Sequence, residues 1–254
     1  MNEHAELLEF AKNAVRSAAA EFQACGHDFL GQVRGTELGG RETKLVADAF
    51  LEDSLTNRLS ETGLSLLSEE SGLIERGTEN DLRWVIDPLD GSVNYLRGSG
   101  PCAISVALCR NNQPVFGVLY TLNNQTLSWG GEGIGAWSDG DAIRVSTTKS
   151  AAEGLICAGI PARFRTNDQN ALNSYFQLIS RFAKVRMLGS AASSLLLVAR
   201  GAADAYCEQQ IMFWDVAAGL AIVQGAGGAF DVRQTGSVDP CTVLATNKQI
   251  SLEF

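Results

Sequence analysis

A short acidic turn after a predicted strand constrains this chain more than any other feature. Arg83 to Ile86 has the character of a strand, and Asp87-Pro88-Leu89-Asp90-Gly91-Ser92 follows it directly. Pro88 restricts Asp87 to an extended conformation, whereas Gly91 permits a tight turn from which a short helix could begin. The backbone N–H groups of Gly91 and Ser92 would then point to one spot, which suits an anion. Two carboxylates beside such a turn make sense if cations lie between them. On spacing alone, a capped turn with solvated aspartates explains the segment equally well.

Two other acidic places are less informative when each is taken alone. Glu69-Glu70 follows a predicted strand over Leu64 to Leu67, and adjacent carboxylates are common in surface loops. Asp215 follows Trp214 at the start of an apolar stretch, where an aspartate usually caps a helix or lies in its first turn.

The hydrophobic pattern predicts a mixed α and β chain. Apolar residues at helical spacing predict a first helix around residues 7–22, and Leu51, Leu55 and Leu59 mark a second one. Between them we expect a loop from Gly26 to about Thr43. Later strands and helices are predicted over residues 103–109, 114–120, 125–129, 135–137, 155–159, 169–182, 185–188, 190–200, 203–208, 214–224, 228–232 and 243–246. We expect two halves, 1–150 and 151–254, packed as one compact unit.

Composition narrows the class of protein. The chain has 254 residues, 45% of them hydrophobic, and a net charge of −9, which argues against a nucleic-acid polymer as partner. No apolar run reaches about 18 residues and no secretory signal is evident, so we predict a cytoplasmic protein without a membrane partner. Six cysteines without C-x-x-C spacing and only two histidines make a zinc site improbable.

Taken together, the three acidic places resemble the inositol monophosphatase superfamily of metal-dependent phosphatases. Trp84 to Tyr95 matches its central motif W-x-I-D-P-[IL]-D-G-[ST]-x-N-[FY], and Ser68 to Ser71 matches its paired-glutamate motif. Trp214 to Gly219, continued to Gly228, matches its C-terminal motif. The resemblance implies an α/β (α+β) fold, a layered α-β-α-β-α sandwich, in a homodimer. It also implies Mg²⁺-dependent hydrolysis of a small phosphate monoester, such as an inositol monophosphate or a related sugar or metabolite phosphate.

The resemblance further implies roles for individual residues. Glu69, Asp87 and the carbonyl of Leu89 would bind one Mg²⁺, Asp87, Asp90 and Asp215 a second, and a weaker third ion would lie near Glu69. Ser92 and Glu69 would orient and deprotonate the attacking water. The expected substrate-binding residues are Asp90, Gly91, Ser92, Ser190, Ala191, Glu208 and Asp215. Oxygen ligands suit magnesium, and without cations each like-charged pair at 4 Å would cost about 4 kcal/mol.

Two other segments leave their interpretation open. The glycine-rich stretch Gly130 to Ala136 leads into strand-like sequence, so a hairpin explains it better than a dinucleotide-binding loop. Arg163 and Arg165, after Gly159-Ile160-Pro161-Ala162, would either meet a second phosphate or be solvated.

One segment departs from the family pattern. Relatives carry D-x-V-T-x-x-D where this chain has Glu42 to Asp48, so Leu45 replaces the threonine and Glu42 the first aspartate. The lysine of the preceding loop is absent unless Arg34 or Arg41 substitutes for it. Alternative functions therefore stay open: a 3′(2′),5′-bisphosphate nucleotidase, a histidinol-phosphate phosphatase, a fructose-1,6-bisphosphatase, or a weakly active regulatory or binding relative.

Overall fold

A computed structural model describes residues 3–25, 32–37, 42–76, 81–162, 169–234, 236 and 239–252. The helical spacing near the N-terminus forms α1 (Glu3–Ala24), which packs with α2 (Val46–Leu59). Both helices bury their apolar side chains, among them Val15 and Leu51. A 3-10 turn (Ser60–Thr62) follows α2 and precedes the first strand of the larger sheet.

The larger sheet has eight strands in the order β10-β9-β8-β7-β6-β5-β3-β4. Within this sheet, β5 pairs in parallel with β3 and antiparallel with β6. Asn111 and Asn112 both have positive φ in the hairpin between β6 and β7, where the sequence predicted a turn. The strands are β3 (Ser65–Ser68), β4 (Gly72–Ile74), β5 (Leu82–Asp90), β6 (Ala103–Arg110), β7 (Gln113–Thr121), β8 (Thr126–Gly131), β9 (Gly135–Ser138) and β10 (Asp141–Ala142).

The smaller sheet has five strands in the order β12-β11-β13-β15-β14. The first of them begins after a 3-10 turn, Ala151–Glu153, so the division predicted near residue 150 falls between the sheets; the division itself stays a prediction. The strands are β11 (Leu155–Gly159), β12 (Lys184–Arg186), β13 (Ala205–Ile211), β14 (Ala229–Arg233) and β15 (Cys241–Thr246), and the helices of this half are α4 (Gln169–Ile179), α5 (Ala191–Ala199) and α6 (Phe213–Gly225).

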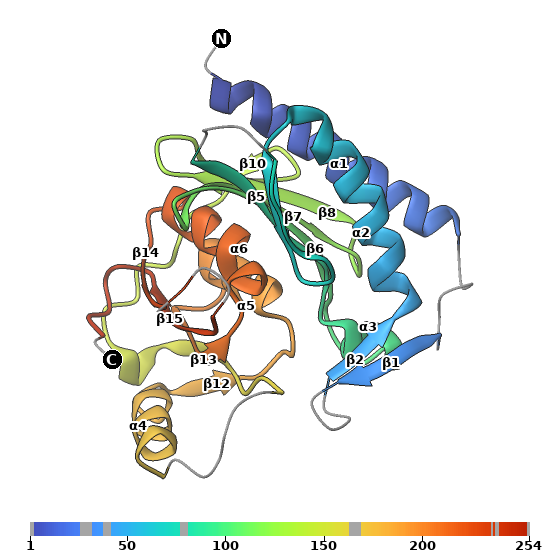
Figure 1. Ribbon diagram of the computed structural model, residues 1–254. Coiled ribbons are helices and arrows are strands. Elements are labelled where there is room, and N and C mark those ends of the chain that lie inside the picture. Colours follow the sequence, from blue (N-terminus) through green and yellow to red (C-terminus); the bar gives the residue numbers. More distant parts are fainter. Residues whose placement is uncertain are drawn as a thin grey trace.

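The elements stack in five layers, as the resemblance implied (Figure 1). Side chains along β5 point alternately to the two faces of the sheet, which accounts for this stacking. Trp84 and Ile86 join the core under α1 and α2, whereas Val85 joins the core shared with α5 and α6. A third core joins α4 to the outer face of the five-stranded sheet. The layered α-β-α-β-α prediction is confirmed. The helices α5 and α6 therefore lie between the two sheets, and α6 begins close to the end of β5.

The predicted loop up to Thr43 was partly wrong, because β1 (Val33–Glu37) and β2 (Glu42–Leu45) form an antiparallel ribbon there. These strands carry only two aliphatic side chains, Val33 and Leu45, so they lack the alternation by which strands are recognised. Predicted boundaries also shifted at β12, which ends at Arg186 instead of residue 188, and at α4, which ends at Ile179 instead of residue 182. Gly130 to Ala136 forms the β8–β9 hairpin, as expected.

All six cysteines are free thiols, and all but Cys25 are buried, which fits the role of small core side chains. Within the described residues, no helix combines the length and apolar character that crossing a membrane requires.

Candidate active site

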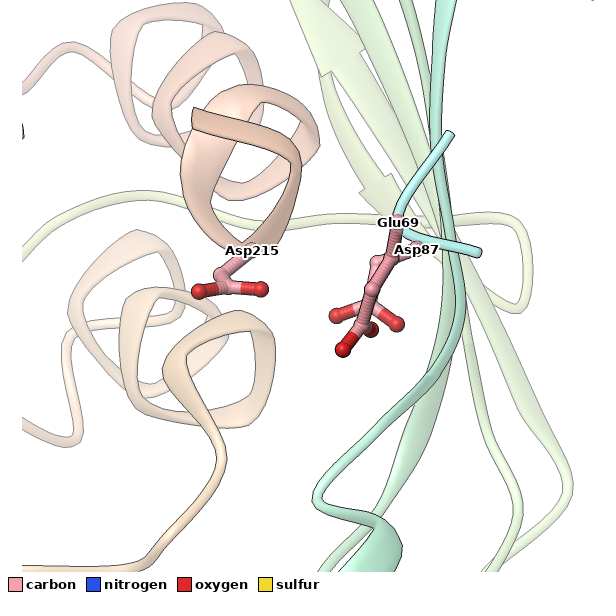
Figure 2. Close-up of side chains that lie close together, drawn as sticks. All are labelled: Glu69, Asp87 and Asp215. Carbon is pink, nitrogen blue, oxygen red and sulfur yellow. The ribbon is translucent and has the colours of Figure 1, made fainter. Parts of the chain in front are cut away.

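The ends of two parallel strands bring the first acidic residues together. Asp87 lies on β5, and Glu69 follows β3, the parallel neighbour of β5. Asp215 reaches the same place from the first turn of α6 (Figure 2). Carboxylate oxygens of Glu69, Asp87 and Asp215 all lie within 4.8 Å of one another. Three residues far apart in the sequence thus form one group that could hold a metal ion.

The three carboxylates, which we call the acidic cluster, place like charges close together. Asp87 is only 1% exposed, and burial together with the charges of Glu69, Asp90 and Asp215 raises its pKa well above the ordinary value. Burial also raises the pKa of Glu69 against the opposing charge of Lys44. The backbone N–H of Leu89 donates to Asp87 Oδ1 at 3.0 Å. The cluster has more negative charge than its neighbours neutralise, which favours bound cations.

Asp90 lies on the same strand but in different surroundings. Its carboxylate accepts hydrogen bonds from the Ser190 hydroxyl and from the backbone N–H groups of Ala191 (3.1 Å) and Ala192 (2.9 Å), at the start of α5. Burial outweighs these hydrogen bonds and raises the pKa of Asp90 to about 6. Asp90 does not belong to the group of carboxylates within 4.8 Å of one another. The structure thus holds Asp90 with its own donors.

The turn after Asp90 requires a glycine and leads to a serine held by a second aspartate. Gly91 has φ +86°, and a Cβ there would lie 2.9 Å from the Pro101 carbonyl oxygen. Helix α3 (Ser92–Arg97) follows, and the Ser92 hydroxyl lies 2.8 Å from Asp48 Oδ1 and 2.9 Å from the Leu89 carbonyl oxygen. Asp48 is buried in the first turn of α2, and burial raises its pKa to about 7.

Glu208 comes from β13 in the five-stranded sheet and lines the same cavity as the acidic cluster. It accepts a hydrogen bond from the Tyr206 hydroxyl at 2.7 Å, and burial raises its pKa to about 7 despite that bond. Gly159 makes room for it, because a Cβ at Gly159 would overlap the Glu208 carboxylate.

All the site residues predicted from the sequence line a single cavity of about 660 Å³. They are Glu69, Asp87, Leu89, Asp90, Gly91, Ser92, Ser190, Ala191, Glu208 and Asp215. Gly159 to Ala162 also line it, whereas Arg163 and Arg165 lie outside the described residues. The structure brings the predicted residues together; their roles stay predictions.

Sequence reasoning missed two residues of this region. Asp48 was noted as a retained motif position but not as a site residue, although it fixes Ser92. Lys44 was overlooked: its ammonium lies 3.1 Å from Glu69 Oε1 and 2.7 Å from Glu70 Oε1. A signal existed, since Lys44 stands where the motif has valine. Burial alone would lower the pKa of Lys44, but the two glutamates raise it above its ordinary value. Arg34 lies outside the 660 Å³ cavity, and Arg41 is not among the described residues.

Comparison with known proteins shows which family the chain belongs to. The model of the inositol monophosphatase family matches residues 3–250. The chain belongs to the inositol monophosphatase family. An inositol-1-monophosphatase of a Synechocystis species is 34% identical to it over 97% of this chain and 86% of the relative.

Two other members of the family carry a different name. The Nus factor SuhB of Escherichia coli is 33% identical over 72% of this chain and 67% of the relative. The crystal structure of the extragenic suppressor protein suhB from Bartonella henselae has a TM-score of 0.82 and 26% identity, and covers 96% of this chain and 94% of that one. The family therefore supports phosphatase activity in general terms, while its members carry more than one functional name.

Proposed function

We propose that this member of the family is a Mg²⁺-dependent phosphatase of a small phosphate monoester. The observation that carries the proposal is the acidic cluster: the oxygens of Glu69, Asp87 and Asp215 lie within 4.8 Å of one another in a cavity that Asp90 also lines. A cavity of about 660 Å³ is the size of a small-molecule site.

The donor set fits magnesium. Every side-chain donor of the cluster is a carboxylate oxygen, and the charges of Glu69 and Asp215 help to raise the pKa of Asp87, as expected where positive charge is missing. Glu69, Asp87 and the Leu89 carbonyl are proposed to hold one ion, and Asp87, Asp90 and Asp215 a second. When bound, the ions supply countercharge for the substrate phosphate and lower the pKa of water.

The residues beside the cluster are arranged to position and deprotonate water. If Ser92 donates its single hydroxyl hydrogen to Asp48 Oδ1, its oxygen lone pairs are left to accept a hydrogen bond from water. The proton can then pass through the Ser92 hydroxyl to the Asp48 carboxylate, which lies 2.8 Å from it. Glu69 lines the same cavity and accepts or orients the second hydrogen. Water is proposed to attack phosphorus directly, without a phosphoenzyme.

The cavity wall suits a substrate that carries hydroxyl groups. Glu208 lines the cavity and offers carboxylate oxygens to such groups as hydrogen-bond acceptors. This supports an inositol or sugar monophosphate as substrate. Arg163 and Arg165 lie outside the described residues, so the test below also includes bisphosphates.

Phosphate release from a panel of monoesters and bisphosphates tests the proposal. The panel contains inositol 1-phosphate, fructose 1,6-bisphosphate, histidinol phosphate and adenosine 3′,5′-bisphosphate, each with Mg²⁺ and with EDTA. We expect turnover that needs Mg²⁺ and is fastest with inositol 1-phosphate. If no substrate were turned over above background at any Mg²⁺ concentration, the proposed phosphatase activity would be refuted. Light scattering of the same sample tests the homodimer that the resemblance implies.

A binding or regulatory role is the second candidate. It is favoured by the relative named Nus factor SuhB and by the changes at Lys44 and Leu45 in the segment before α2. The same panel separates the two functions, because a purely regulatory protein would release no phosphate while still being folded.

A further inference from the structure

Lys44 places a positive charge beside the acidic cluster. It lies on β2, one residue before the N-cap of α2, and its side chain is only 15% exposed. Its ammonium contacts Glu69 Oε1 at 3.1 Å and Glu70 Oε1 at 2.7 Å. Glu69 belongs to the acidic cluster, whereas Glu70 lines a neighbouring cavity of about 510 Å³. The lysine therefore bridges the two adjacent glutamates.

The surroundings of this bridge hold a further negative charge. Glu52 on α2 is buried and lines the neighbouring cavity with Lys44 and Glu70. One of its oxygens accepts from the Ser68 hydroxyl (2.7 Å) and the Glu70 N–H (3.3 Å), and the other, Oε1, has no hydrogen-bond partner among the described residues. The Lys44 ammonium thus pairs with two glutamates and shares a cavity with a third, and this fixed cation lies where this family member has lysine instead of valine.

We propose that Lys44 is a built-in cation for Glu69 and Glu70, so that the site binds two divalent ions and not three. The inference rests on the proposed metal-dependent function, since it concerns the ligands of that site. A divalent ion near Glu69 must share its oxygens with Lys44, and like charges repel. An ion that would need Glu69 and Glu70 together is displaced by the lysine, whereas ions held by Asp87 and Asp215 keep ligands that Lys44 does not touch.

The number of bound ions tests this directly, without any measure of activity. Metal-free protein is titrated with Mn²⁺, and free Mn²⁺ is followed by electron paramagnetic resonance. We expect two ions per chain in the unchanged protein. Lys44→Met keeps a long side chain without charge, and we expect a third ion there. We also expect an affinity at Glu69 about tenfold higher, within the usual range of coupling between two binding events.

Two variants serve as controls. Lys44→Arg keeps the charge and should bind two ions. Lys149→Met removes a charge from an exposed position and should also bind two. If Lys44→Met does not fold, Lys44→Gln takes its place as the test variant.

Each outcome bears on a different claim. Three ions in the unchanged protein, or the same number and affinity in Lys44→Met or Lys44→Gln as in the unchanged protein, would overturn the role of Lys44. No bound ion in any variant would overturn the proposed metal-dependent function itself.

Discussion

Asp87 and Asp90 lie three residues apart on β5, yet their surroundings are opposite in kind. Asp87 faces two other carboxylates and accepts one backbone hydrogen bond at 3.0 Å. Asp90 faces the start of α5, where a hydroxyl and two N–H groups donate to it. Both are buried, and both carry a raised pKa, but that of Asp90 rises only to about 6.

The difference shows which charges the chain neutralises by itself. Fixed dipoles and hydrogen bonds stabilise Asp90, as donors at a helix N-terminus do for an anion. In the acidic cluster the donors are spread over its three members: the Leu89 N–H donates to Asp87, the Met212 N–H to Asp215 and the Lys44 ammonium to Glu69. The cluster is proposed to depend on bound cations as well. Loss of one carboxylate should therefore have opposite effects on stability in the two places, although both losses should reduce turnover.

The largest effect is expected for Asp87→Asn. Asp87 is a proposed ligand of both ions, so turnover with Mg²⁺ should fall by at least about 10³-fold, the upper end for loss of one electrostatic group. In EDTA the variant should melt above the unchanged protein, because repulsion within the cluster is relieved. A gain of 1 kcal/mol corresponds to about 2–4 °C for a chain of this size.

Thermal melts with and without Mg²⁺ measure this change. Asp141→Asn, at an exposed position on β10, is the matched control and should alter neither turnover nor melting. A melting temperature in EDTA that falls in Asp87→Asn would show that the cluster is neutralised without ions.

A smaller loss, about 10²-fold in turnover, is expected for Asp90→Asn. The amide keeps one acceptor oxygen but turns its NH₂ group toward one of the two N–H donors of α5. A buried donor without an acceptor costs about 1–3 kcal/mol, so the melting temperature in EDTA should not rise. Turnover within a few-fold of the unchanged protein would contradict the role of Asp90. A rise in melting temperature equal to that of Asp87→Asn would contradict the comparison.

The sequence predicted those parts of the site whose residues lie close together along the chain, and missed contacts between residues that are far apart in the sequence. Asp87, Asp90, Gly91 and Ser92 form one local motif, so their shared position was predictable, and the motifs around Glu69 and Asp215 completed the lining. The surroundings of each carboxylate were not predictable, because the donors to Asp90 lie about a hundred residues further along the chain. Lys44 was missed for the same reason, since its two partners lie beyond α2.

The fold, too, was predicted in part and missed in part. Buried apolar runs, such as the one in β6, predicted the central strands correctly. The ribbon of β1 and β2 has exposed residues and no apolar alternation, and the sequence predicted a loop there.

A still smaller effect is expected for Glu208→Gln. Glu208 lies outside the acidic cluster and is proposed to accept hydrogen bonds from substrate hydroxyl groups. Its loss should raise KM for inositol 1-phosphate by about tenfold, the equivalent of about 1.4 kcal/mol, and leave kcat within a few-fold. Steady-state kinetics measures both, with the exposed Glu153→Gln as control. An unchanged KM would remove Glu208 from the binding surface, and a large fall in kcat alone would place it among the residues that act on the reacting atoms.

The last prediction concerns the stability of the metal-free protein against pH. Burial raises the pKa of Asp48 and of Glu208 to about 7, from ordinary values of 3.8 and 4.5. At pH values between the ordinary pKa and the raised pKa, the folded chain binds more protons than the unfolded chain. The free energy of unfolding therefore decreases as pH rises. The contribution of both groups is present in full below about pH 4 and is lost as pH rises through about 7.

In EDTA we therefore expect the melting temperature to fall by a few degrees between pH 5 and pH 8, at about 2–4 °C per kcal/mol. Asp48→Asn and Glu208→Gln should each flatten the decrease, because each removes one buried acid whose pKa is raised to about 7. Saturating Mg²⁺ should reduce the contribution of Asp48 to this fall in melting temperature more than the contribution of Glu208. The reason is that Asp48 contacts Ser92, whose hydroxyl also contacts the Leu89 carbonyl, a proposed metal ligand. A slope unaffected by either variant would show that neither buried carboxyl group controls it.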